Sequence, residues 1–196
     1  MTDNVFEISQ HMMQQARCII CRLGIEEAWK SVAAEPHLVG SVRMGLLMKH
    51  RDIDYHIYSA PLRIEDSFEA VARIAAHDGV EQLSYTNLLH TDEACIEWHM
   101  GYRDEYGELW QIDMIHILRG SRYDGFFERQ ASRIVEVLTP ERRKTILQLK
   151  YETPADVKIM GVEYYRAVIE GNVRDYANFE AWRRQHPVNG IVEWIP

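Results

Sequence analysis

The chain is 196 residues long and 46% hydrophobic, which is enough for one domain with a real core or for two small ones. It has no run of about 18 uncharged apolar residues, so we expect no membrane span, and its N-terminus does not resemble a signal peptide. The net charge of −8 is uneven: residues 1–120 hold 10 Lys and Arg against 19 Asp and Glu, whereas residues 121–196 hold 12 against 11. Because nucleic-acid affinity depends on neutralising phosphates, the acidic part predicts no nucleic-acid partner and favours a small neutral or cationic one.

Residues 4–24 are predicted to form an amphipathic helix that ends at Gly24. Its apolar positions recur at helical spacing: Met12, Ala16, Ile19, Ile20 and Leu23. Cys18 and Cys21 lie on or beside this stripe, and no second ligand pair follows at zinc spacing, so we expect core thiols rather than a metal site. With Cys95 the cysteine count is odd, which argues against a disulfide framework and favours a reducing, cytoplasmic setting.

A second helical segment, 25–34, leads to a short strand at 37–39 and then to Gly40-Ser41. Ser41 is expected to cap a helix over 42–48, and a helix N-terminus preceded by glycine is a ready anion site. Arg43 lies one turn into that helix, where it can reach a phosphate with two hydrogen bonds or stay on the solvated surface.

Asp52 and Asp54 lie in an alternating apolar run that predicts a strand over 52–58. Residues two apart on a strand face the same way, so the two carboxylates point together, roughly 7 Å apart at about 3.3 Å per residue. Two such anions repel each other unless a cation lies between them. Mg²⁺ is the expected cation, because it prefers carboxylate oxygens and substrate phosphates.

A helix is predicted over 66–79, with a buried stripe of Phe68, Val71, Ala72, Ile74 and Ala75. Three strands follow, at 80–89, 94–102 and 109–118. If the last two pair antiparallel about the turn at 104–108, Asp113 lies opposite Trp98 or His99. Glu97 and His99 are then either acceptor-binding or basic groups at a cleft, or a polar pair that faces solvent.

After Gly120 the pattern changes to helices, predicted at 123–138, 139–151, 153–171 and 174–185. We therefore place a boundary there, between a domain at 1–120 and a helical domain at 121–196. Basic residues of the second domain lie either along a cleft between the two domains or on a solvated face. They are Arg142, Arg143, Lys144, Lys150 and Lys158.

Taken together, Gly40-Ser41, the ten-residue gap, Asp52-Ile53-Asp54 and the later strand residue Asp113 resemble the signature of the nucleotidyltransferase superfamily. This superfamily includes polymerase-β-like enzymes and small antibiotic and minimal nucleotidyltransferases. The resemblance implies an α+β fold in which a mixed β-sheet flanked by helices, the catalytic domain 1–120, precedes the C-terminal helical domain. It also implies that Asp113 lies on a later antiparallel strand.

The function implied by the resemblance is transfer of a nucleoside monophosphate from a nucleoside triphosphate, with ATP taken as the donor, to a hydroxyl of a small molecule. Asp52, Asp54 and Asp113 would be the catalytic residues and the ligands of Mg²⁺ or Mn²⁺. Gly40, Ser41 and Arg43 would bind the triphosphate. Two other interpretations stay open: an interaction protein of the toxin–antitoxin type that binds or modifies a partner protein, and a D-x-D glycosyltransferase. A homodimer is also left open.

Overall fold

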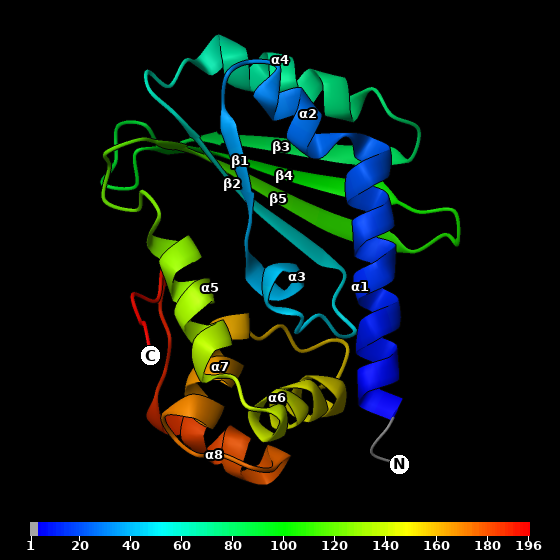
Figure 1. Cartoon of the computed structure of the whole chain (residues 1–196), viewed down its shortest axis with the longest axis vertical. Coiled ribbons are helices and arrows are strands. Elements are labelled where there is room, and N and C mark those ends of the chain that lie inside the picture. Colours follow the sequence, from blue (N-terminus) through cyan, green and yellow to red (C-terminus); the bar gives the residue numbers. More distant parts are fainter. Residues whose placement is uncertain (1–3) are drawn as a thin grey trace.

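The computed structural model describes residues 4–196 and is an α+β structure built on one five-stranded mixed sheet (Figure 1). The strands are β1 Glu35–Leu38, β2 Asp52–Ser59, β3 Val80–Asn87, β4 Cys95–Arg103 and β5 Leu109–Leu118. Their order in the sheet is β1-β2-β5-β4-β3. The three strands predicted after residue 79 and the strand of the two aspartates are therefore confirmed.

β2 and β5 pair in parallel, whereas β1 with β2, β5 with β4, and β4 with β3 pair antiparallel. β5, the strand of Asp113, is antiparallel to β4 as predicted, and it pairs in parallel with β2, the strand of Asp52. The chain leaves β2 through a helix and the β3–β4 hairpin before it returns as β5, and this long connection brings β5 back in the direction of β2.

Eight helices surround the sheet within the described residues. They are α1 Asn4–Leu23, α2 Ile25–Lys30, α3 Gly40–Met44, α4 Ile64–Ala75, α5 Phe126–Val137, α6 Pro140–Glu152, α7 Gly161–Ile169 and α8 Tyr176–Gln185. In Figure 1, α2 and α4 cover one face of the sheet, and α5 to α8 gather at the opposite end of the molecule beside α3. Within residues 4–196, no helix combines the length and apolar character that crossing a membrane requires.

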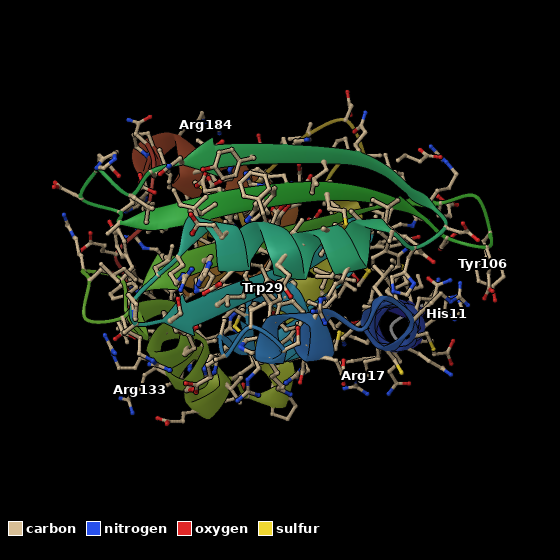
Figure 2. The ribbon with its side chains drawn as sticks, turned by 90° about the horizontal axis from the view of Figure 1, so that it is seen from above. His11, Arg17, Trp29, Tyr106, Arg133 and Arg184 are labelled. Atoms are coloured by element: carbon tan, nitrogen blue, oxygen red, sulfur yellow. The ribbon has the colours of Figure 1, made fainter. Side chains whose placement is uncertain are left out.

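The interior divides into two main apolar clusters. One lies between the sheet, α2 and α4 and contains Trp29, which is fully buried and is seen in the middle of the molecule from above (Figure 2). The other joins α5 to α8 with Met44 and Leu46 near α3. α1 belongs to both, since Val5 packs in the second cluster and Leu23 in the first. This long helix therefore joins the sheet to the C-terminal helices, and the division at residue 120 stays a proposal.

Several local predictions at α3 were wrong. The helix covers Gly40–Met44 rather than 42–48, and Val39 precedes it without a side-chain cap. Gly45 ends it in the left-handed conformation, with φ 67°. The next residues leave the helix and bury their side chains in both apolar clusters: Leu46 and Met48 in the second, and Leu47 in the first.

The sides of two helices also differ from expectation. Cys18 and Cys21 are exposed, because they lie on the opposite side of α1 from the buried positions Ala16 and Ile19. On α4, Phe68 is 47% exposed and Ala72 is exposed too. The side of α4 that meets the sheet is set by Ser67, Ala70, Val71 and Ile74.

The third C-terminal helix begins at Gly161, not near Thr153 as predicted. Between them the chain is irregular, and Lys158, Ile159 and Met160 border the same cavity as the aspartates. The local sequence Thr-Pro-Ala-Asp resembles a helix start, but the segment stays irregular and lines this cavity with its last three residues.

Candidate functional site

The pairing of β2 with β5 brings the three predicted carboxylates to one face of the sheet. Asp54 and Asp113 are register partners on neighbouring strands, which places their backbones about 4.8 Å apart. Asp52 lies two residues before Asp54 on the same face, beside Gln111. Their neighbours Ile53 and Ile112 point into the apolar cluster and are fully buried. Strand alternation therefore separates the core from a row of acids.

These carboxylates affect one another. Burial, and then the charges of Asp113 and Asp52, raise the pKa of Asp54 from 3.8 to about 7. Burial also raises the pKa of Asp52, with the charge of Asp113 acting in the same direction. The positive charge of Lys150 acts against both shifts. Like charges that are partly withdrawn from water favour a bound cation, and this is the condition that oxygen ligands of Mg²⁺ meet.

Asp113 is held by its neighbours on β4 and β5. His99 is its register partner across the hairpin, and the distance from His99 Nδ1 to Asp113 Oδ1 is 2.7 Å. Gln111 donates from Nε2 to both carboxylate oxygens of Asp113, at 3.1 and 3.0 Å. The pairing of Asp113 with His99 is one of the two registers predicted from the turn, and it excludes the pairing with Trp98. Gln111 was assigned no role from sequence, although its alternation with Asp113 places it on the same face.

Gly40 is in close contact with Asp54. A β-carbon at Gly40 would lie 1.9 Å from Asp54 Oδ2, and the backbone of Gly40 has φ +62°. No residue with a side chain fits there without displacing the carboxylate. The predicted Gly-Ser turn and the aspartate strand are thus parts of one site, and Gly40 makes room for a carboxylate.

The hydroxyl of Ser41 is part of a buried polar network rather than a helix cap. Lys150 on α6 donates to Ser41 Oγ at 2.9 Å, to the Leu46 carbonyl oxygen at 3.0 Å and to the Tyr165 hydroxyl at 3.2 Å. Ser41 Oγ and the Tyr165 hydroxyl are 3.1 Å apart. An ammonium group has three N–H donors, and all three are used here. Lys150 therefore positions two hydroxyl groups and supplies charge.

Asp52 borders four cavities of the described chain. One, of about 320 Å³, also contains Asp54, Asp113 and Lys158. A second, of about 50 Å³, is lined by Ser41 and other residues around Lys150. These two cavities adjoin the row formed by Asp52, Asp54 and Asp113, which we call the acid row.

The two larger cavities lie on either side of the aspartates. A cavity of about 330 Å³ extends from Asp54 toward α5 and α7, and it is bordered by Ser41, Phe127 and Tyr165. An open groove of about 700 Å³ lies over β3, β4 and β5, and His99 lines it. The acids are thus placed between two spaces large enough for small ligands.

Some residues predicted to bind phosphate or to line a cleft do not lie at the cavities around the aspartates. Arg43 is exposed and borders none of the four cavities, so its role at a phosphate stays a prediction. Arg143 donates to the carbonyl oxygens of Met44 and Gly45 at the end of α3, at 3.2 and 2.7 Å. Lys144 is exposed. Tyr165 was not singled out from sequence, because nothing local to an apolar helix position marks a contact with a residue 124 positions away.

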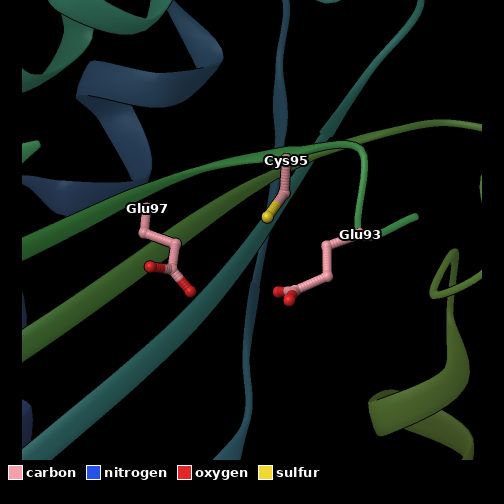
Figure 3. A group of neighbouring side chains, drawn as sticks. All are labelled: Glu93, Cys95 and Glu97. Atoms are coloured by element: carbon pink, nitrogen blue, oxygen red, sulfur yellow. The ribbon is translucent and has the colours of Figure 1, made fainter. Parts of the chain in front are cut away.

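The donor set suits divalent cations that prefer oxygen, since three carboxylates share one row. Within residues 4–196, one group of three acidic, cysteine or histidine residues has all its ligand atoms within 4.8 Å of one another, and it is Glu93, Cys95 and Glu97 (Figure 3). The three aspartates are therefore more widely spaced than a single tight cage.

Solved structures similar to this chain include a poly(U) polymerase, a poly(A) polymerase and an RNA terminal U-transferase. One is the Cid1 poly(U) polymerase with MgGTP bound, with a TM-score of 0.59 and 13% identity, covering 85% of this chain and 54% of that chain. Another is the complex of the poly(A) polymerase GLD-2 with GLD-3, with a TM-score of 0.58 and 11% identity, covering 86% and 57%. A structure of a cytoplasmic RNA terminal U-transferase has a TM-score of 0.56 and 14% identity, covering 85% and 52%.

The chain has a nucleotidyltransferase fold. This confirms the predicted α+β fold class and the fold that the Gly-Ser and aspartate pattern implied. The chain spans little more than half of the length of these solved structures. No protein-family model matches the sequence, and no curated protein matches it. The shared fold says where a nucleotidyltransferase site would lie, and the residues in it must decide the chemistry.

Proposed function

We propose that this chain transfers a nucleoside monophosphate from a nucleoside triphosphate to a hydroxyl group of a small molecule and releases pyrophosphate. The observation that carries the proposal is the register of Asp54 with Asp113 on two parallel strands, with Asp52 on the same face. In the reaction the acceptor oxygen forms a bond to the α-phosphorus. The bond from that phosphorus to the bridging oxygen breaks, and the hydroxyl proton passes to a carboxylate oxygen of Asp113.

The donor nucleotide fits the side of the site bordered by Gly40, Ser41 and Tyr165. The 330 Å³ cavity there adjoins Asp52 and Asp54 and extends to Phe127, whose ring offers an apolar surface to a nucleobase. The hydroxyl groups of Ser41 and Tyr165, which Lys150 holds in place, can donate to phosphate oxygens. The positive charge of Lys150 attracts the negatively charged triphosphate. ATP is the donor we take first, although no residue of the cavity selects its base.

The acceptor hydroxyl belongs on the Asp113 side. His99 and Gln111 fix both oxygens of that carboxylate, so its orientation is set before an acceptor arrives. Asp52, Asp54 and Asp113 would hold Mg²⁺ or Mn²⁺, which supplies positive charge to the phosphate oxygens and lowers the pKa of the attacking hydroxyl. Because phosphoryl-group transfer depends mainly on positioning and charge, this arrangement is sufficient without a further nucleophile on the protein.

The test is a transfer assay with the four α-labelled nucleoside triphosphates, Mg²⁺ or Mn²⁺, and a cell extract as the source of acceptors. We expect label on a small molecule, and we expect Asp113→Asn to lower single-turnover transfer by at least about a thousandfold with nucleotide affinity nearly unchanged. Transfer by Asp113→Asn at the rate of the original chain would contradict the proposal.

A second candidate is transfer to the 3′ end of RNA, because the titles of the similar structures name poly(U) and poly(A) polymerases and an RNA terminal U-transferase. The net charge of −8 opposes it. Label on RNA in the same assay would favour this candidate. Label on a polypeptide would instead favour the interaction-protein interpretation.

A further inference from the structure

The 700 Å³ groove over β3, β4 and β5 begins where Asp113 is held. Its inner end is formed by Asp52, His99 and Gln111, and the last two are the side chains bonded to Asp113. The groove then runs outward over Gly101 to Gln82 and Ser84 on the edge strand β3. A molecule that fills the groove therefore reaches the acid row at one end and solvent at the other.

The groove exists because Gly101 has no side chain. Gly101 lies in a cross-strand row between Gln111 and Gln82, on the same face as His99. A β-carbon at Gly101 would lie 3.3 Å from Gln82 Cβ and 3.6 Å from Leu109 Cδ1. Any larger residue would occupy the middle of the groove.

Apart from Asp52, which belongs to the acid row, the Lys, Arg, Asp and Glu residues that line the groove are already paired with other protein groups. Arg51 Nη2 lies 3.0 Å from Glu108 Oε2. Glu81 accepts two hydrogen bonds from Arg103, at 2.6 and 2.8 Å. Of the lining residues, all of which lie in the described part of the chain, Arg51 is the one Lys or Arg. A phosphate backbone would find no free cation among them.

The remaining lining chemistry is that of neutral hydrogen-bonding groups beside apolar surface. Gln82, Ser84 and Gln111 offer amide and hydroxyl groups, and Leu109, 47% exposed, supplies the apolar surface. Of the Phe, Tyr and Trp residues of the described chain, Trp110 is the one that lines the groove, and it is fully buried, so it cannot stack on a base. The imidazole of His99 also lines the groove, and it is bonded to Asp113. Hydroxyl groups that alternate with C–H faces match such a surface.

We infer that this groove binds the acceptor and that the acceptor is a neutral, hydroxyl-rich small molecule of the sugar or polyol class. The inference rests on the proposed function, since it names the acceptor of the same reaction. It assigns Gln82 and Ser84 as acceptor-binding residues and Gly101 as the position that keeps the groove open.

The test divides the small-molecule filtrate of a cell extract with ion-exchange resins into neutral, cationic and anionic fractions, with hexauridylate RNA as a fourth acceptor. The full chain is incubated with each, with Mg²⁺ and the α-labelled nucleotides. We expect label in the neutral fraction. Gly101→Val should lower that transfer at least about tenfold, with nucleotide affinity unchanged within about twofold. Ser84→Ala, which leaves the backbone unaltered, should raise the acceptor KM with less effect on kcat.

Thr86→Val is the matched control, because Thr86 is exposed on the same edge strand and lies outside the groove. It should transfer like the original chain. Label on the cationic or anionic fraction or on RNA overturns the inference and leaves the proposed function standing. The inference is also overturned, and the proposed function left standing, if Gly101→Val and Ser84→Ala both transfer to the neutral fraction at the rate of the original chain. No label in any fraction, from protein that is folded and binds nucleotide, overturns the proposed function itself.

Discussion

Alternate residues of β5 lie in opposite environments. Trp110, Ile112 and Met114 are fully buried against the apolar cluster, whereas Gln111 and Asp113 face the cavities. The first side is held together by burial of apolar area, and the second places charged groups close together at a cost in stability. Substitutions at adjacent residues of β5 should therefore have different effects: one should lower stability, and the other should slow the transfer reaction.

The largest expected effect on stability comes from a substitution on the buried side of β5, compared with one at the adjacent residue on the cavity side. Ile112→Ala should lower the free energy of unfolding by about 2–5 kcal/mol, because it leaves a cavity in a fully buried site. Gln111→Ala should change it by less than about 0.5 kcal/mol, since Gln111 is exposed, yet it should slow transfer. Denaturant melts and transfer rates of the two variants measure this. Equal loss of stability in both would remove the distinction between the two sides.

Asp54→Asn should stabilise the cation-free protein at neutral pH. The pKa of Asp54 is raised from 3.8 to about 7 in the folded chain. Between those values the unfolded state holds fewer protons, so the stability contributed by protonated Asp54 is lost as pH rises through that range. Above pH 7 the variant should exceed the original chain by on the order of 3 kcal/mol. Melting curves from pH 4 to pH 8 measure this difference.

Asp156→Asn serves as the control for the Asp54 variant, because Asp156 is exposed and does not line the cavity of the three aspartates. It should follow the pH dependence of the original chain. An Asp54→Asn curve that runs parallel to the original one at all pH values would contradict the electrostatic coupling of the acid row.

Gly40→Ala tests the close approach at the donor side. The new β-carbon would meet the Asp54 carboxylate at 1.9 Å, and Gly40 has φ +62°. Gly107→Ala is the matched control, since Gly107 has φ +81° with nothing within 4 Å. Both should lose about 1 kcal/mol from the left-handed backbone. Gly40→Ala should lose about 1–2 kcal/mol more and most of its nucleotide affinity. If calorimetry shows equal affinities for the two variants, Gly40 is not part of the site.

Lys150→Met removes the donor that joins α6 to Ser41 and Tyr165. It should cost about 1–3 kcal/mol, because buried oxygen acceptors lose their partner, and should slow transfer about tenfold. Lys144 lies on the exposed side of the same helix, so Lys144→Met should leave both the free energy of unfolding and the transfer rate nearly unchanged. Nucleotide affinity and unfolding curves compare them. A slowed Lys144→Met would indicate a role for the exposed basic residues.

Strand alternation and turn composition were enough to predict most of the fold. The apolar–polar pattern around Asp52 and Asp113 predicted which side chains of each strand share a face. The hairpin turn narrowed the partner of Asp113 to Trp98 or His99, and the structure shows His99. The parallel pairing of β2 with β5 was missed, because strands separated by a long connection carry no local sign of their direction.

The rest of the site depends on contacts distant in sequence. Tyr165 reaches Ser41 across 124 positions, and Lys158 reaches the cavity from a segment predicted as helix. The predicted cap by Ser41 failed because a buried lysine uses that hydroxyl. In each case a long-range contact replaced the local interaction that the sequence favoured.

We propose above that the three aspartates together bind divalent cations, which in turn contact the phosphates of a bound nucleotide. Electron paramagnetic resonance of Mn²⁺, with a non-hydrolysable triphosphate analogue present, measures this directly. We expect saturable Mn²⁺ binding by the original chain, and loss of most of it in the double variant Asp52→Asn with Asp54→Asn while the protein stays folded. Unchanged Mn²⁺ affinity and stoichiometry in that double variant would contradict it.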